Sequence, residues 1–247
     1  MKNLHLYKFD NYSQNGEDGI IKEILNRSFS DKKINTVEFG AGDIEKNSNT
    51  FNLIKDDKVN NAVFVEIDLV LHKKLIELKN TFSSIVPINQ KVEIEKNHQN
   101  SIDNILKEND IENNIDIMSI DIDSYDLDVY RSIEIYFPKL LIIEGGRQKY
   151  GVFSEHSMNG ESNSFSSIHQ EVSKKFELIG YNGNLFFLNK NYFSKEHIIK
   201  NYIIDDEYHY LLHCIYVNYK KRGFLKKKLM NLISKNKQFL KLLINYK

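Results

Sequence analysis

The sequence predicts an α/β fold with a mostly parallel sheet of seven strands, flanked by helices and completed by an antiparallel final strand. Three observations predict it. Short apolar runs rich in β-branched residues alternate with segments in which apolar residues recur at helical spacing. Several of these runs end in glycine or acidic residues, as buried parallel strands do where they meet a loop. The last two runs are separated by Gly183, which is typical of a hairpin.

The first half of the chain supplies a helix and three strands. Residues 13–29 read SQNGEDG and then IIKEILNRSF, where apolar residues recur at helical spacing and predict a lead-in helix. INTVEFGAG (34–42) predicts a strand ending in a Gly-x-Gly turn, and NAVFVEID (61–68) predicts a strand ending in acidic residues. LVLHKKLIEL (69–78) predicts a helix, and SSIVPINQKV (83–92) predicts the third strand.

The second half continues the alternation and ends in paired strands. Ser101 suits the N-cap of a helix that begins IDNILKEN, and IDIMSIDID (115–123) is a fourth strand that runs into carboxylates. PKLLIIEGG (138–146) follows as a fifth strand, and a helix is expected over residues 165–175. FELIGYN and NLFFLNK complete the sheet. In such a fold the ligand lies at the carboxyl ends of the strands.

Composition indicates an ordinary globular protein with one main domain. The chain has 247 residues, of which 41% are hydrophobic and 28% charged, and no Gly/Ser or Pro tract separates independent modules. We expect a main domain over residues 1–193 and a helical extension over 194–247. The single cysteine, Cys214, excludes an internal disulfide, and no apolar stretch follows the basic start, so a cytoplasmic location is expected.

The charge of the chain is zero overall but unevenly placed. No Asp or Glu follows Glu207, so residues 208–247 carry +10 and the preceding part carries −10. Two explanations stay open for this basic, amphipathic tail. It is either a helical cap with solvated lysines, or a contact to an enzyme complex or to the anionic inner face of a membrane. Nucleic acid is not an expected partner, because the basic charge is confined to the tail and no zinc ligand set is present.

The Gly-x-Gly turn after the first strand is a candidate cofactor loop, although such turns also occur without a ligand. Gly40 and Gly42 allow a ligand to approach the backbone, and Glu38 can accept a hydrogen bond from an ammonium group. The turn has neither the third glycine of a dinucleotide fingerprint nor a Lys-Ser/Thr pair, which disfavours a pyrophosphate. Glu66, at the end of the next strand, can accept both hydroxyls of a ribose. An adenosine ligand without phosphates fits both the missing pyrophosphate-binding pattern and the position of Glu66.

Carboxylates also end the fourth and fifth strands. Asp121 and Asp123 project to the same side if the fourth strand persists, and Glu144 leaves the neighbouring strand at a similar height. The three carboxylates could hold Mg²⁺ or Ca²⁺, or one of them could act as a base, and the alternative is a solvated turn with a helix cap. Two histidines follow, His156 in the polar loop and His169 on the next helix, and a surface or structural role is the usual one for each. Of the two, His156 is favoured as a candidate base, because loops at this edge of the sheet cover the pocket.

Several runs, in this order, resemble the FkbM-like S-adenosylmethionine-dependent methyltransferases over most of residues 12–193. The runs are SQNGEDGIIKEIL, VEFGAG, VFVEID, SIDIDSYDLDVYRSI, FPKLLIIE and GYNGNLFFLNK. The resemblance implies the Rossmann-like class I methyltransferase fold, S-adenosylmethionine as methyl donor, and O-methylation of sugars or polyketide-type hydroxyls.

The resemblance also assigns roles to residues. It implies that Gly40 and Gly42 lie against the methionine part of the cofactor, that Glu66 binds the ribose, and that Asp121 faces the sulfonium. It implies that Asp123 and Glu144 face the acceptor. The residues expected to border the cofactor pocket are Gln14, Glu17 and Asp18.

Two departures from the family pattern leave the acceptor open. Residues 147–165 replace the usual acceptor loop, and the basic extension is additional. The resemblance alone implies O-methylation of a sugar, either nucleotide-linked or part of a bacterial surface polysaccharide. The alternatives are methylation of a phosphate- or amine-bearing small molecule, and a non-catalytic partner subunit with the same fold. Metal dependence and the formation of a homodimer stay open.

Overall fold

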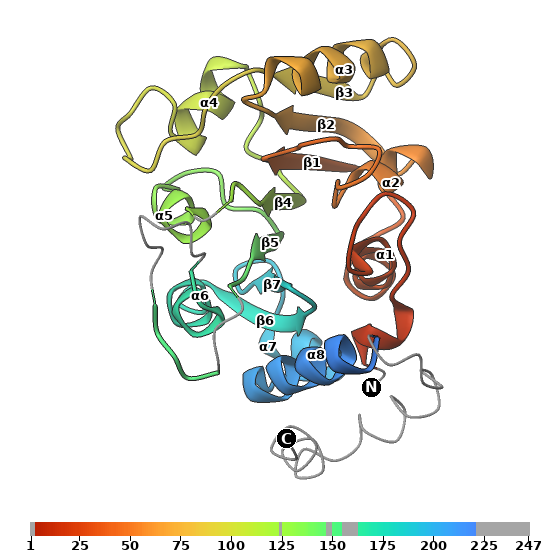
Figure 1. The fold of residues 1–247 in the computed structure, drawn as a ribbon, viewed down its shortest axis with the longest axis vertical. Coiled ribbons are helices and arrows are strands. Elements are labelled where there is room, and N and C mark those ends of the chain that lie inside the picture. The colour runs from red at the N-terminus through yellow and green to blue at the C-terminus, as the bar shows by residue number, and fades with distance from the viewer. Residues whose placement is uncertain (1–2, 124, 147–149, 155–162, 221–247) are drawn as a thin grey trace.

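The computed structural model describes residues 3–123, 125–146, 150–154 and 163–220, and its centre is one sheet of seven strands (Figure 1). The strands lie in the order β3-β2-β1-β4-β5-β7-β6. Their bounds are β1 Ile34–Phe39, β2 Val59–Val65, β3 Ile85–Ile88, β4 Ile117–Ile120, β5 Leu140–Glu144, β6 Phe176–Tyr181 and β7 Asn184–Asn189.

The predicted Rossmann-like architecture is confirmed. Strands β1 to β5 pair in parallel, and β7 pairs antiparallel with both β5 and β6. The hairpin that closes the fold therefore inserts its second strand between β5 and β6. The chain turns from β3 back to β4 on the other side of β1, which makes the β1–β4 boundary the switch point of the sheet.

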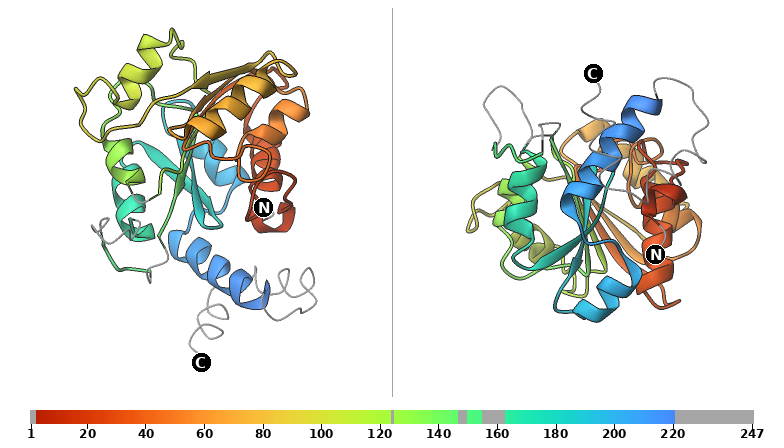
Figure 2. Two further views of the ribbon diagram at one scale, coloured as in Figure 1. Left: turned by 45° about the horizontal axis from the view of Figure 1, so that its top comes forward. Right: turned by 90° about the horizontal axis from the view of Figure 1, so that it is seen from below.

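Helices cover both faces of the sheet (Figure 2). One core lies between the sheet and helices α1, α2, α3 and α7, and the other lies between the sheet and helices α4, α5 and α6. The helix bounds are η1 Leu4–Tyr7 (a 3-10 helix), α1 Glu17–Ser28, α2 Phe51–Lys55, α3 Leu69–Lys79, α4 Ile102–Glu108, α5 Asp126–Arg131, α6 Phe165–Val172, α7 Lys195–Asn201 and α8 Asp206–Lys220.

Local sequence signals explain where several elements begin and end. The side chain of Ser101 accepts a hydrogen bond from the backbone N–H of Asn104, so Ser101 is the N-cap that the sequence predicts. Asp68 caps α3 in the same way. Two strands are shorter than predicted: β3 covers Ile85–Ile88 and β4 covers Ile117–Ile120, so Asp123, with a positive φ of 56°, lies in the loop that follows β4.

The described part of the C-terminal extension packs on the main domain. Ile198 of α7 and Tyr202, which follows that helix, belong to one of the two cores, and α8 contacts β6. No helix among the described residues is both long and apolar enough to cross a bilayer. Most of the basic tail, for which a membrane or enzyme-complex contact is expected, lies beyond residue 220 and outside the described residues.

Candidate functional site

The site is organised by a backbone contact at the switch point. Gly40, directly after β1, has a φ of 75°, and a Cβ atom placed there would lie 1.7 Å from the carbonyl oxygen of Asp121. Asp121 directly follows β4 and donates its backbone N–H to Phe39. Only glycine fits this position, because any larger residue would collide with the backbone of the neighbouring strand. The contact places the Asp121 side chain at the crevice where open α/β sheets bind ligands.

A first cavity of about 590 Å³ opens at the ends of β1, β2 and β3. Its volume is in the range of pockets that bind small molecules and cofactors. Gly40, Gly42 and Asp121 line it on the side of the switch point, and Glu66 follows β2. Apolar side chains form much of the remaining wall, namely Val65, Ile67, Leu71, Val92 and Ile94. A flat apolar group with a polar, hydroxylated end suits this lining.

Glu66 shapes the first cavity and keeps capacity for a ligand. One carboxylate oxygen accepts the backbone N–H of Gly42 at 2.6 Å, and the other accepts that of Asp68 at 2.7 Å. These two bonds fix the carboxylate across the end of β2. Because each carboxylate oxygen can accept more than one hydrogen bond, Glu66 can still receive two ligand hydroxyls.

A second cavity of about 700 Å³ shares one described lining residue, Asp121, with the first. Glu144, at the end of β5, lines only the second cavity, whereas Asp123, which the sequence places with Glu144 on the acceptor side, lines only the first. The described lining also includes α8 and several side-chain amides, among them Gln14 and Asn49. Asp121 can therefore contact a ligand in either cavity.

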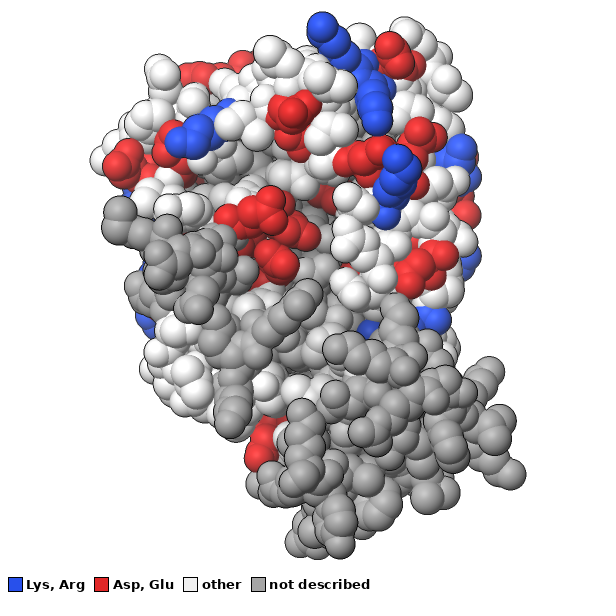
Figure 3. Space-filling view, in the orientation of Figure 1, with Lys and Arg blue, Asp and Glu red and all other residues white. Residues whose placement is uncertain are grey.

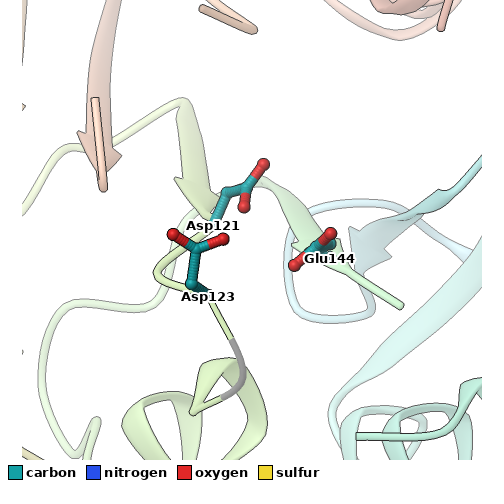
Figure 4. A group of neighbouring side chains, drawn as sticks. All are labelled: Asp121, Asp123 and Glu144. Carbon is teal, nitrogen blue, oxygen red and sulfur yellow. The ribbon is translucent and has the colours of Figure 1, made fainter. Parts of the chain in front are cut away.

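Asp121, Asp123 and Glu144 form the acidic group that the sequence predicts. Each offers an oxygen within 4.8 Å of those of the other two. Figure 4 shows Asp121 and Asp123 after β4 and Glu144 at the end of the adjacent strand β5. In the space-filling view, acidic side chains gather in a hollow near the centre of the face (Figure 3). The sequence predicts that β4 continues to Asp123. Instead, β4 ends at Ile120, and Asp123 lies in the following loop with a positive φ.

The acidic group holds a proton in the absence of a cation. Burial raises the pKa of Asp121 to about 8, and the nearby carboxylate of Glu144 adds to the rise, followed by those of Asp126 and Asp123. A divalent cation or a cationic ligand group would relieve the same repulsion and favour the ionised form. Three carboxylate oxygens at this spacing suit Mg²⁺ or Ca²⁺, whose preferred ligands are oxygens.

Two of the predicted cofactor residues instead hold the protein's own backbone. Glu38 is 2% exposed and accepts hydrogen bonds from Ser48, Asn49 and Thr50, and burial raises the pKa of its carboxyl group. Asp18 accepts the backbone N–H groups of residues 11–13. Neither side chain lines either cavity. We therefore assign both to positioning, Glu38 of the turn that carries Asn49 and Asp18 of the segment before Gln14.

The remaining predicted residues have different positions. Gln14 lines the second cavity, and so does Glu17, whose carboxylate accepts hydrogen bonds from Asn182 and Asn184. His169 lines neither cavity, and its Nδ1 lies 3.4 Å from a carboxylate oxygen of Asp206. His156, the predicted base, lies outside the described residues.

Sequence reasoning missed Gln90. It lies two residues after β3 and lines the first cavity, and its Oε1 atom is buried without a hydrogen-bond partner among the residues that the structure describes. An unsatisfied buried acceptor costs stability and indicates a missing donor. The rule that ligands bind at the carboxyl ends of parallel strands would have identified this residue.

Comparisons with known proteins give distant structural similarities only. No family model matches the chain, and no curated protein matches it. M. capricolum TrmK in complex with S-adenosyl-homocysteine has a TM-score of 0.48 at 13% identity, covering 90% of this chain and 96% of that one. An Aquifex aeolicus SAM dependent methyltransferase has a TM-score of 0.42 at 9% identity, covering 68% and 88%.

A third similar structure has a different description. The [4+2]-cyclase SpnF has a TM-score of 0.45 at 8% identity, covering 97% of this chain and 81% of that one. With identities of 13% or less and TM-scores below 0.5, these three similarities decide neither the reaction nor the substrate. The function has to follow from the residues of the two cavities.

The raised pKa of Asp121 predicts a loss of stability with rising pH. In the unfolded chain the carboxyl group has its ordinary pKa, so between about pH 4 and pH 8 the native state binds one more proton. The stabilisation is complete at low pH and is lost as the pH rises through about 8. The Asp121→Asn variant lacks this carboxyl group and therefore its contribution to the pH dependence of the free energy of unfolding. The free energy of unfolding, measured with urea and EDTA at about pH 5 and pH 9, should therefore fall less in Asp121→Asn than in the wild type.

The exposed Asp31→Asn is the matched control and should keep the pH dependence of the wild type. Equal pH dependence in Asp121→Asn and the wild type would contradict the shifted pKa.

Proposed function

We propose that the chain is an S-adenosylmethionine-dependent methyltransferase that binds its cofactor in the first cavity and its acceptor in the second. One observation carries the proposal: two ligand-sized cavities share a single described carboxylate, Asp121, at the switch point of the sheet. Group transfer needs this arrangement, because donor and acceptor atoms must be held in contact and in line.

The residues of the first cavity fit the cofactor. Glu66 suits the ribose hydroxyls, the apolar side chains beside it suit a flat base, and the unpartnered Oε1 of Gln90 suits the amino group of adenine. Asp121, once ionised, stabilises a positive charge at the junction of the cavities. S-adenosylmethionine supplies an activated methyl group on such a positively charged sulfur.

The chain's own residues align the reaction and accept a proton. The acceptor oxygen attacks the methyl carbon, the carbon–sulfur bond breaks with its electron pair left on sulfur, and an oxygen–carbon bond forms. The hydroxyl proton passes to a carboxylate, for which Asp123 and Glu144 are the candidates within the described residues. The same two carboxylates can orient a diol directly or through Mg²⁺.

For the acceptor we propose a sugar hydroxyl, free or nucleotide-linked. The sequence resemblance to the FkbM-like enzymes supports this choice. Side-chain amides in the second cavity, such as those of Gln14, Asn15 and Asn47, also support it, because amides and carboxylates hydrogen-bond to hydroxyl groups.

The cofactor proposal predicts that binding depends on Glu66. We expect S-adenosylhomocysteine to bind the wild type and to bind Glu66→Ala about 100-fold more weakly, since two hydrogen bonds to a charged carboxylate are lost. Glu66→Gln keeps an acceptor for Gly42 and should lose less. Isothermal titration calorimetry measures both, with unfolding temperatures recorded for each variant.

Glu45→Ala is the control for the Glu66 variants, because Glu45 is exposed and lines neither cavity. It should leave the affinity unchanged. No binding of either S-adenosylmethionine or S-adenosylhomocysteine to the wild type would remove the methyltransferase proposal and favour a non-catalytic partner subunit.

Gln90 should recognise the exocyclic amino group of adenine. An analogue of S-adenosylhomocysteine with purine in place of adenine lacks this group, and the wild type should bind it about tenfold more weakly. Gln90→Leu should bind the two ligands within about threefold of each other. Competition calorimetry measures the ratio, with Gln99→Leu, an exposed position, as the control. A ratio that Gln90→Leu leaves unchanged would refute the assignment.

Asp123 and Glu144 should both affect transfer, and Glu144, which lines only the second cavity, should do so without changing cofactor affinity. We expect Asp123→Asn and Glu144→Gln to lower kcat by about 100-fold or more, and we expect Glu144→Gln to keep S-adenosylhomocysteine affinity within about threefold of wild type. The assay uses tritiated S-adenosylmethionine with methyl glycosides and nucleotide sugars. If the carboxylates act through Mg²⁺, EDTA abolishes wild-type transfer, and if one acts as the base, EDTA leaves transfer intact. Unchanged kcat in both variants would exclude both roles.

A further inference from the structure

One face of helix α8 is buried against the protein, and the other lines the second cavity. Tyr208, Leu211, Leu212 and Ile215 are all buried, and they lie on one side of the helix. The opposite side lines the second cavity with the stripe Tyr210, His213, Cys214 and Val217. This stripe follows the i, i+3, i+4, i+7 spacing of a single helix face.

Side-chain contacts of the first half of α8 hold the helix beside the second cavity. The hydroxyl of Tyr150 donates to the carboxylate of Asp206 at 2.7 Å, and Asn3 donates to the hydroxyl of Tyr208 at 2.9 Å. His209 is 3% exposed, and its Nε2 lies 2.8 Å from the carbonyl oxygen of Ile203. The helix therefore belongs to the folded domain, and its cavity face has a fixed position.

The cavity face of α8 has the chemistry of a ligand wall. A helix face directed to solvent usually carries charged residues. Here no Asp, Glu, Lys or Arg occurs between Tyr208 and Tyr219. The ring of Tyr210 stacks on that of Tyr181 with centroids 6.2 Å apart, and His213 meets Tyr181 edge to face at 4.7 Å. This wall carries aromatic and small apolar side chains without a carboxylate, lysine or arginine, and it lines the same cavity as Asp121 and Glu144.

We propose that α8 forms one wall of the acceptor subsite, and that Tyr210, His213, Cys214 and Val217 determine which acceptor is methylated. The acceptor would be a small hydroxylated ring that places an apolar face against α8 and a hydroxyl towards the carboxylates. The inference rests on the proposed methyl transfer, and it assigns acceptor choice to the C-terminal extension.

The alkylation rate of the single cysteine measures whether a ligand covers this wall. Cys214 is the only thiol in the chain and is partly buried in the second cavity. Burial raises the pKa of its thiol, so alkylation by N-ethylmaleimide is followed at about pH 9 by mass spectrometry. The rate is measured with the protein alone, with saturating S-adenosylhomocysteine, and with S-adenosylhomocysteine plus each member of a panel. The panel contains methyl glycosides, nucleotide sugars and catechols, which distinguishes sugar rings from phenolic rings.

We expect panel compounds that accept tritiated methyl groups to slow the alkylation about tenfold when present at about ten times their dissociation constant. Compounds that are not methylated and do not bind should have no effect. A methylated compound that leaves the rate unchanged overturns the inference while the proposed function stands. If no compound is methylated, a protecting compound supports the wall, and the absence of any protection overturns it. Protection by S-adenosylhomocysteine alone also overturns it, because α8 would then line the cofactor subsite.

A pair of tryptophan variants gives an independent measurement. Cys214→Trp fills the second cavity and should raise the KM of the best panel acceptor about tenfold or more, with S-adenosylhomocysteine affinity within about threefold of wild type. Ile199→Trp places the same side chain at an exposed position of α7 outside this cavity and should leave both values unchanged. Equal KM values for the two folded variants would contradict the proposal.

Discussion

The approach of the β1 end to the β4 end is the constraint on which the site depends. Gly40 lies against the carbonyl group of Asp121, at a distance that excludes a side chain. This contact fixes Asp121 at the point where the sheet changes direction. It also leaves space on either side, so the two cavities share one carboxylate and are otherwise lined by different elements. Glu66 and Gln90 extend one cavity along β2 and β3, while β5, the β6–β7 turn and α8 enclose the other.

The charges at the site favour a cationic ligand. Three carboxylates with oxygens within 4.8 Å of one another repel, and the ligand-free protein reduces the repulsion by holding a proton on Asp121. A positively charged group at the junction of the cavities would replace that proton and stabilise the ionised form. The acidic group therefore lowers stability in the free protein and favours a cationic ligand, a combination often found at functional sites.

Local patterns in the sequence predict most of the fold. The apolar runs that become β1, β2, β4 and β5 end in glycines and carboxylates, and the pairing of β6 with β7 follows from the glycine between them. Tertiary contacts decide the rest. Glu38 and Asp18 have the residue type of ligand-binding groups, but their carboxylates are used by neighbouring backbone N–H groups. The cavity face of α8 could not be predicted either, because an apolar helix face looks the same whether it packs on protein or on a ligand.

A crystal structure of the protein grown with S-adenosylhomocysteine tests the central claim most directly. We expect adenine in the first cavity beside Gln90, the ribose hydroxyls on Glu66, and the sulfur next to Asp121, with the second cavity still open. A ligand bound with its sulfur away from Asp121, or density for it in the second cavity alone, would contradict the division into a cofactor cavity and an acceptor cavity.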